Sequence, residues 1–213
     1  ISDFMKLGTS LKVEGTLVNS AVAKDSVEIN AESIEVLGEC PPEYPLQKKR
    51  HTLEYLRTIP HLRVRTNTFN AVFRVRSVVS AAIHEFFQAR HFTYIHTPLI
   101  TASDCEGAGE MFKVTTIGYS NEYKNEEEYN AADFFGRRAA LSVSGQLEGE
   151  VAAMAMGKIY TFGPSFRAEK SNTPRHVAEF WHVEPEVAFA ELPDIIEIAE
   201  DMIKTIIKDT MDA

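Results

Sequence analysis

The chain has 213 residues, 31 acidic against 22 basic for a net charge of −9, and 44% of them are apolar. The apolar content suffices for a substantial core, and no segment approaches the roughly 20 apolar residues that span a bilayer, so we expect a cytoplasmic globular protein. Two distant cysteines, Cys40 and Cys105, argue against a disulfide framework, and the acidic balance taken alone argues against a nucleic-acid partner.

The first 40 residues follow the pattern of short β-strands. Apolar and polar residues alternate over residues 11–18 and 26–32, and a third run follows at 33–38. Three strands are too few to close a sheet, so we expect this segment to be the end of a β-barrel. Three prolines within residues 41–45 then interrupt regular structure, and we place a domain boundary there.

The next segment, residues 41–67, is the most basic part of the chain. Its positive charges begin at Lys48, Lys49 and Arg50 and continue to Arg65. Such a run is either a solvated linker or a hinge that contacts phosphates, and composition leaves both readings open.

Periodic patterns then predict helices and a loop. Apolar residues recur every three or four positions over Thr68–Arg90, which predicts a long amphipathic helix, and a strand is expected at Phe92–His96. The polar, acidic stretch 118–136 is interpreted as a mobile surface loop. A short helix is predicted over Gln146–Met156, ended by Gly157, and Pro193 opens a final amphipathic helix.

Two strand patterns, Lys158–Arg167 and Val177–Phe189, are joined by turn-forming residues, which predicts an antiparallel hairpin. Side chains at alternate positions of a strand share a face. The expected core face of the second strand holds Trp181, Val183, Pro185, Val187 and Phe189, and the opposite face holds Phe180, His182, Glu184 and Glu186. An aromatic ring beside Arg167 suits a purine nucleotide, and carboxylates suit an ammonium or amide group. The alternative is a polar sheet surface with ordinary ion pairs and an incidental Phe.

Linked motifs carry a resemblance to a known family. The segment Phe166-Arg167-Ala168-Glu169, with Arg175-His176 and Glu179-Phe180, resembles motif 2 of the class II aminoacyl-tRNA synthetases, and the long helix, strand and Pro98 resemble motif 1. Residues 101–112, 142–147 and 178–186 narrow the resemblance to the asparaginyl-tRNA synthetases, bacterial type. The related aspartyl and lysyl enzymes usually carry a different loop at residues 105–109 and a proline in place of Gly145.

The resemblance implies a fold class and a division of the chain into domains. The fold class is α+β: the end of an OB-fold β-barrel is followed by the first part of a class II catalytic domain, an antiparallel sheet flanked by helices. Residues 1–40 would be a partial OB-fold anticodon-binding domain, residues 41–67 a basic hinge, and residues 68–213 a partial catalytic domain with motifs 1 and 2. Motif 1 would form a homodimer interface.

The resemblance also assigns roles in ATP binding, and Mg²⁺ would bridge phosphate oxygens. Arg167 would be catalytic, holding the α-phosphate and the substrate carboxylate while stabilising the charge that builds at phosphorus. His176, aided by Arg175, would reach the terminal phosphate. Phe180 would stack on adenine, with Glu169 near the same end. No metal ligand is assigned in the chain.

The substrate roles follow from the same resemblance. Glu106 and Gln146 would receive the amino acid's ammonium group. Glu186 would accept from the side-chain amide of asparagine and repel aspartate, although Glu184 and Glu186 could instead hold metal or pair with arginines. The expected tRNA contacts are Lys48, Lys49, Arg50, Lys170, Ser171, Asn172 and Thr173.

No segment after Pro193 matches motif 3 of the class, so we expect a fragment of a longer synthetase that cannot complete adenylation alone. The expected reaction is ATP-dependent activation of asparagine and its transfer to tRNA(Asn), by an asparagine–tRNA ligase. The alternatives are an aspartyl-type synthetase, a paralogue that makes asparagine from aspartate, and a non-catalytic tRNA-binding paralogue.

Overall fold

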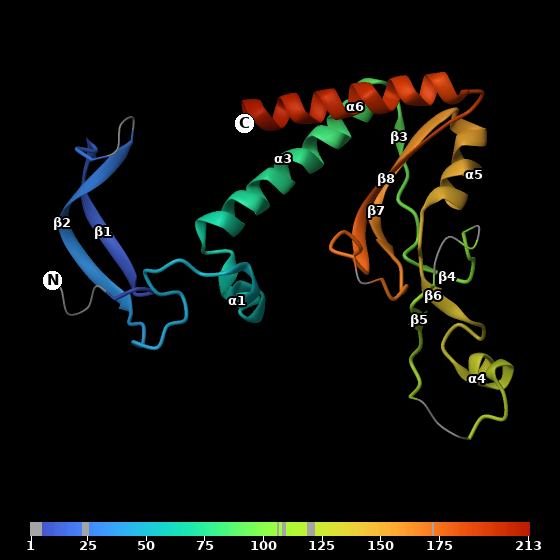
Figure 1. Cartoon of the computed structure of the whole chain (residues 1–213), viewed down its shortest axis with the longest axis horizontal. Coiled ribbons are helices and arrows are strands. Elements are labelled where there is room, and N and C mark those ends of the chain that lie inside the picture. The colour runs from blue at the N-terminus through green and yellow to red at the C-terminus, as the bar shows by residue number, and fades with distance from the viewer. Residues whose placement is uncertain (1–5, 23–25, 106, 108–109, 119–121, 172) are drawn as a thin grey trace. The chain divides into compact units, whose positions relative to one another are not determined.

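The structure is a computed structural model, and it describes residues 6–22, 26–105, 107, 110–118, 122–171 and 173–213 (Figure 1). The chain divides into two compact units, residues 1–74 and 75–213, and each is described by itself. The predicted boundary near residue 40 stays a prediction. The elements, in chain order, are β1 Ser10–Asn19, β2 Val27–Gly38, α1 Leu53–Thr58, α2 Pro60–Arg63, α3 Asn67–Ala89, β3 Thr93–Tyr94, β4 Ile100–Thr101, β5 Lys113–Val114, α4 Glu126–Ala132, β6 Ala139–Leu141, α5 Gln146–Met156, β7 Lys158–Phe166, β8 Glu179–Val187 and α6 Leu192–Asp212.

The first unit begins with a two-stranded antiparallel sheet of β1 and β2, which is consistent with the predicted end of an OB-fold barrel. The prediction of a third strand at residues 33–38 was wrong, because β2 runs without interruption from Val27 to Gly38. The pairing register shifts between Glu14 and Gly15 of β1, which pair with Ser33 and Ala31 of β2. The apolar–polar alternation of β2 therefore changes phase at this bulge, and in the sequence this change resembles the end of one strand and the start of another. Gly15 fits this site because a Cβ would lie 2.2 Å from the carbonyl oxygen of Asn30.

Two short helices, α1 and α2, lie within the basic segment that was predicted as a hinge. The hydroxyl of Thr52 accepts a hydrogen bond of 3.2 Å from the backbone N–H of Tyr55 and caps α1, which buries Leu56. The basic segment is therefore ordered locally and does not form a plain extended linker.

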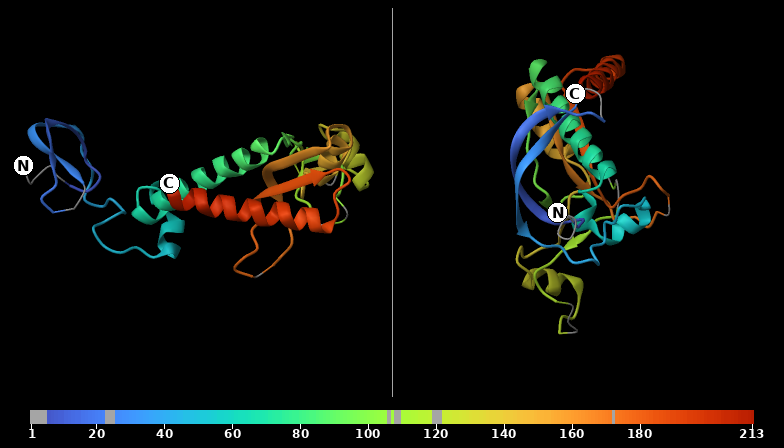
Figure 2. Two further views of the ribbon diagram at one scale, coloured as in Figure 1. Left: turned by 90° about the horizontal axis from the view of Figure 1, so that it is seen from above. Right: turned by 90° about the vertical axis from the view of Figure 1, so that its left-hand side faces the viewer.

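The core of the second unit lies between helices and a three-stranded sheet. The sheet has the order β3-β7-β8, with β3 parallel to β7 and β8 antiparallel to it. The predicted long helix is confirmed as α3, and its buried residues Ile83, Phe86 and Phe87 pack with Tyr160 and Phe162 of β7. Helix α6 covers the same cluster through Ile198, Met202 and Ile206. Figures 1 and 2 show α3 and α6 close to this sheet.

The opposite face of the sheet contacts α5. This helix spans the predicted residues Gln146–Met156, and Gly157, with φ of 82°, ends it by donating its N–H to the carbonyl of Ala153. The predicted hairpin of β7 and β8 is also confirmed, with nine residue pairs in unbroken register. One face of the hairpin therefore packs into the core, and the other is available for a site beside α5.

Three local predictions differ from the structure. The strand expected over Phe92–His96 is limited to β3, although Ile95 still donates its N–H to the carbonyl of Tyr160. The stretch 118–136, predicted as a loop, contains α4, because Asn125 caps it and three glutamates occupy its positive first turn. Phe189, expected on the core face, is fully exposed beyond the end of β8.

Candidate active site

The site lies on the β8 face that is turned toward α5. Phe180, His182, Glu184 and Glu186 pair with Ser165, Gly163, Thr161 and Ile159 of β7 in that order, and all four are half-buried. The opposite face carries Val183 and Val187, which pack on the core cluster. Trp181, also predicted to face the core, is edge-on to Phe162 with centroids 5.0 Å apart but remains 53% exposed.

The residues predicted to bind ATP come together around the turn between β7 and β8, which extends away from the sheet in Figure 2. An open cavity of ≈ 590 Å³ is lined by Arg167, Glu169, Ser171, Arg175, His176, Val177, Ala178 and Phe180. The guanidinium carbon of Arg167 lies 5.4 Å from the ring centroid of Phe180. Both cationic and aromatic groups therefore face one space of nucleotide size.

One polar side-chain atom of Arg167 has no hydrogen-bond partner in the part of the chain that the structure describes. The backbone N–H of Arg167 donates to the carbonyl of Ala178 at 3.0 Å, which fixes the start of the turn. Among the described residues, its Nε is the one buried side-chain nitrogen or oxygen without a hydrogen-bond partner. Buried polar groups are nearly always paired in folded proteins, so this nitrogen is an exception among the described residues.

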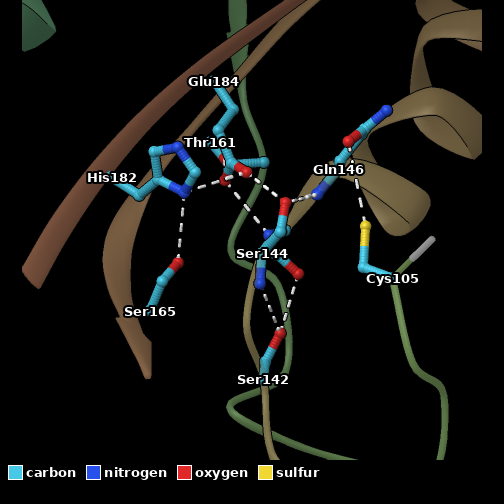
Figure 3. Close-up of polar contacts among 9 residues, drawn as sticks. Cys105, Ser142, Ser144, Gln146, Thr161, Ser165, His182 and Glu184 are labelled. Carbon is cyan, nitrogen blue, oxygen red and sulfur yellow. Dashed lines mark hydrogen bonds and ion pairs between the residues drawn. The ribbon is translucent and has the colours of Figure 1, made fainter. Parts of the chain in front are cut away.

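Glu184 is held by a dense set of donors near the start of α5 (Figure 3). Its Oε2 accepts hydrogen bonds from Thr161 Oγ1 at 2.7 Å and from the backbone N–H of Gly145 at 3.1 Å. Its Oε1 accepts from the hydroxyl of Ser144 and lies 3.2 Å from His182 Nδ1. The sequence placed His182 on the same strand face as Glu184 but did not predict that Ser144, Gly145 and Thr161 surround this carboxylate, because serine, threonine and glycine carry no pattern of their own.

Gln146, the first residue of α5, lies beside the same cluster. Its Nε2 donates to Glu150 at 2.9 Å. Figure 3 shows the thiol of the buried Cys105, which lies 3.8 Å from its Oε1. Cys105 therefore acts as a small neighbour of Gln146, as its position in the segment suggests.

Glu186 lies over Gly149 of α5, where an added Cβ would meet its Cγ at 3.4 Å. Burial, followed by repulsion from Glu150 and Glu184, raises the pKa of Glu186 above the ordinary 4.5 of a glutamate. No hydrogen bond to its carboxylate from another described residue is found, so this group contrasts with the fully engaged Glu184.

The predicted tRNA contacts are distributed over two places. Lys48, Lys49 and Arg50 are exposed in the first unit, and Lys49 and Arg50 line an open cavity of ≈ 780 Å³ with Arg65. In the second unit Lys170 and Thr173 are exposed in the turn, and Thr173 hydrogen bonds to His176. The predicted Glu106 and Asn172 lie outside the described residues, so their placement remains a prediction.

The described residues provide no group of three or more His, Cys, Asp or Glu side chains that could hold a metal ion. None of the described helices is long and apolar enough to cross a membrane.

Comparison with known proteins was made for sequence and structure. A family model described as "tRNA synthetases class II (D, K and N)" matches residues 52–213. The chain is 58% identical to an asparagine–tRNA ligase of Clostridium acetobutylicum over 100% of this chain and 46% of that protein. It is also 58% identical to the asparagine–tRNA ligase of Acetivibrio thermocellus, over 95% of this chain and 44% of that protein. The chain thus spans about half the length of these curated relatives.

Solved structures agree with this similarity. An asparaginyl-tRNA synthetase from Pyrococcus horikoshii, complexed with asparaginyl-adenylate, matches with a TM-score of 0.80 and 29% identity, over 96% of this chain and 43% of that one. An asparaginyl-tRNA synthetase from Entamoeba histolytica matches with a TM-score of 0.76 and 26% identity, over 98% and 45%. Together with the α+β fold and the cavity around Arg167 and Phe180, these matches show that the chain belongs to the class II tRNA synthetases of the D, K and N group.

Proposed function

We propose that the protein containing this chain activates asparagine with ATP and transfers it to tRNA(Asn). The observation that carries the proposal is the cavity that Arg167, His176 and Phe180 line together, with the guanidinium carbon of Arg167 5.4 Å from the centroid of the Phe180 ring. A planar guanidinium suits a phosphoryl oxygen, and an adjacent aromatic ring suits a base.

In the first step, a carboxylate oxygen of asparagine attacks the α-phosphorus of ATP and pyrophosphate leaves. Arg167 holds the α-phosphate against the substrate carboxylate and stabilises the charge that develops at phosphorus. Phe180 stacks on adenine near Glu169, while Arg175 and His176 reach the terminal phosphate. In the second step, a hydroxyl of the tRNA attacks the activated carbonyl and AMP leaves.

The amino-acid site is proposed at the start of α5. Gln146 and Glu106 receive the ammonium group, and Glu184 and Glu186 supply the carboxylates of the pocket. Glu186 accepts from the side-chain amide of asparagine, and its negative charge opposes the second carboxylate of aspartate. The raised pKa of Glu186 fits a carboxylate that is held without a partner.

The remaining partners are also proposals. Lys48, Lys49 and Arg50, together with the turn around Lys170, contact tRNA phosphates, since they are exposed and cationic. Helix α3 and strand β3 correspond to motif 1 and form a homodimer interface. Mg²⁺ would neutralise charge on the phosphates when bound, and the described residues provide no cluster of three or more His, Cys, Asp or Glu side chains for it. We expect the protein to act in the cytoplasm.

The test is ATP–pyrophosphate exchange by the full-length gene product, with asparagine and aspartate compared at equal concentration. We expect exchange that depends on asparagine, followed by charging of tRNA(Asn). Preferential exchange with aspartate would indicate the aspartyl-type enzyme, and free asparagine formed from aspartate and ammonia would indicate the biosynthetic paralogue. Binding of tRNA without any exchange would indicate a non-catalytic protein, and each of these results would overturn the proposal.

A further inference from the structure

Two adjacent phenylalanines are exposed at the tip of a tight turn that follows α4, and the proposed function assigns them no role. The turn consists of Asp133, Phe134, Phe135 and Gly136. The N–H of Gly136 donates to the carbonyl of Asp133 at 2.9 Å, which places both phenylalanines at the central positions of the turn. Phe134 is 75% exposed and Phe135 is 44% exposed. Turn positions favour glycine, proline and short polar residues, so two aromatic rings at this tip indicate a contact with another molecule.

The side chain of Asp133 fastens the turn to the chain that follows β5. Its Oδ1 accepts hydrogen bonds from the backbone N–H of Thr116 at 3.0 Å and from the hydroxyl of the same residue at 2.7 Å. The rings of Phe134 and Phe135 stand edge-on to each other, with centroids 4.9 Å apart. Because these contacts order both rings in advance, a partner that stacks on them loses little affinity to side-chain ordering.

Positive charge follows the aromatic pair directly. Arg137 and Arg138 are both exposed, and neither forms an ion pair with any of the described residues. The three glutamates of α4 occupy its first turn, at the other end of the helix. We call residues 133–138 the aromatic–arginine turn, since it presents exposed rings and two cationic groups side by side in the sequence.

This combination matches an unpaired nucleic-acid strand. Proteins bind single strands by stacking bases on aromatic rings while cationic side chains contact the phosphates. A duplex keeps its bases stacked inside the helix, and an apolar protein surface would leave two guanidinium groups without partners. The glutamates in the first turn of α4 repel phosphates, so a bound strand is directed toward Arg137 and away from α4.

The aromatic–arginine turn is joined to the proposed reaction centre by β6, which lies between α4 and α5 in Figure 1. Arg138 directly precedes β6, and Ser142 directly follows it. The carbonyl of Ser142 accepts the N–H of Phe166 at 2.9 Å, and Arg167 is the next residue. A strand rises about 3.3 Å per residue, so the chain from Arg138 to Ser142 spans about 13 Å. An unpaired strand of a few nucleotides bridges this distance.

We infer that the aromatic–arginine turn binds the unpaired 3′ strand of tRNA, with a base stacked on Phe134 and a phosphate held by Arg137. This inference rests on the proposed function and adds an RNA contact that neither the β7–β8 turn nor the basic segment supplies. The turn acts in binding alone, so activation of asparagine without tRNA does not depend on it.

The first test measures tRNA binding and asparagine-dependent ATP–pyrophosphate exchange separately in the full-length gene product. Loss of one stacked base should weaken tRNA binding by about fivefold or more in Phe134→Ala. Phe134→Leu should weaken it similarly, because leucine keeps an apolar side chain but lacks the flat ring, and Phe134→Tyr should bind as the wild type does. Exchange without tRNA should be unchanged in all three variants.

The second test removes the RNA strand itself. A tRNA shortened by its unpaired 3′ nucleotides should bind to wild type and to Phe134→Ala with affinities within about twofold of each other. With intact tRNA, Arg137→Ala should lower the slope of log affinity against log salt by about 0.7, the value for one phosphate of a single strand. With shortened tRNA this slope should not change. Lys204→Ala, on the exposed surface of α6, is the charge control for both RNAs.

Several results would overturn the inference. They are unchanged binding of intact tRNA by Phe134→Ala, a defect that persists with shortened tRNA, and full binding by Phe134→Leu. A lower unfolding temperature of Phe134→Ala with unchanged tRNA binding would also overturn it, since the ring would then be covered by another part of the polypeptide. If Phe134→Ala fails to fold, Arg137→Ala with the two RNAs decides the question.

The same measurements keep the inference apart from the function beneath it. A wild type that shows no asparagine-dependent exchange would overturn the proposed function. An active wild type whose turn variants bind intact tRNA normally would overturn the role of the aromatic–arginine turn alone.

Discussion

The guanidinium carbon of Arg167, the residue directly after β7, lies 5.4 Å from the ring centroid of Phe180, the second residue of β8. The antiparallel pairing of these strands, which ends at Phe166 and Glu179, brings a cation and an aromatic ring to the mouth of one cavity.

Replacing Arg167 should abolish activation with little effect on folding. We expect Arg167→Ala to lower asparagine-dependent ATP–pyrophosphate exchange by about 100-fold or more, because a preorganised donor to the reacting phosphate is lost. Arg167→Lys should not restore the rate, since an ammonium cannot supply two parallel donors. Exchange within about tenfold of wild type in Arg167→Ala would contradict the catalytic role.

Replacing Phe180 should weaken ATP binding in particular. Stacking of a base on an aromatic ring contributes about 1–3 kcal/mol, so Phe180→Ala should raise KM for ATP by about 5- to 150-fold. Phe180→Tyr should retain most of the affinity. The matched control is Trp181→Ala, which removes the neighbouring aromatic side chain on the opposite strand face. An equal rise in KM in both alanine variants would refute a specific stacking role.

Glu186 should make stability depend on pH. Because its pKa is raised in the folded protein, the folded state holds the proton more tightly than the unfolded state. The contribution of the Glu186 carboxyl to the free energy of unfolding is therefore complete below the ordinary glutamate pKa of 4.5, and it is lost as the pH rises through the raised pKa of this group. Glu186→Gln should unfold at a higher temperature than wild type near neutral pH, and this difference should shrink toward pH 4.5.

The control for that measurement is Glu179→Gln, at the exposed start of β8. Thermal unfolding followed by circular dichroism from acid to neutral pH compares the three proteins. Parallel profiles for wild type and Glu186→Gln would show that burial of this carboxylate does not influence folding.

The core beneath the site should depend strongly on Phe87. This side chain is completely buried and stacks on Tyr160 with centroids 4.5 Å apart. Phe87→Ala should destabilise the protein by about 3–5 kcal/mol, because it removes apolar contacts and leaves a cavity. Phe134→Ala, at a ring that is 75% exposed, should change stability by far less. Urea denaturation measures both, and similar midpoints would contradict the assigned core.

The basic segment should contribute electrostatically to tRNA binding. Replacing Lys48, Lys49 and Arg50 together by alanine should weaken tRNA binding and lower its salt dependence, since each phosphate contact contributes about 0.9 to the slope of log affinity against log salt. Activation of asparagine without tRNA should be unchanged. Lys204→Ala, on the exposed surface of α6, is the charge control. An unaltered salt slope in the triple variant would remove the segment from the tRNA interface.

The sequence predicted those parts of the fold whose pattern is periodic or marked by a cap. Helix α5 is an example, because Ser144 lies near its start and Gly157 ends it. Helix α4 was missed because its stability comes from the Asn125 cap and first-turn charges and not from an apolar stripe. The break expected within β2 was a bulge, which changes the phase of alternation while pairing continues.

The charged residues of the candidate site were predicted better than the groups that donate hydrogen bonds to them. Alternation along β8 correctly grouped Phe180, Glu184 and Glu186, since strand period alone decides which side chains share a face. The donors around Glu184 come from the start of α5 and from β7, so their convergence depends on tertiary packing. Sequence could not reveal that Glu184 and Glu186, two residues apart, have opposite surroundings.

The unbroken register of β7 and β8 limits where this chain can change in length. Each of their nine pairs is directly opposed, and a one-residue insertion in either strand would exchange the two faces beyond it. Glu184 and Glu186 would then enter the aromatic core, and Val183 and Val187 would face α5. The turn between the two strands, which leaves the sheet in Figure 2, escapes this constraint. We therefore expect relatives to vary in length within the turn and to keep both strands free of insertions and deletions.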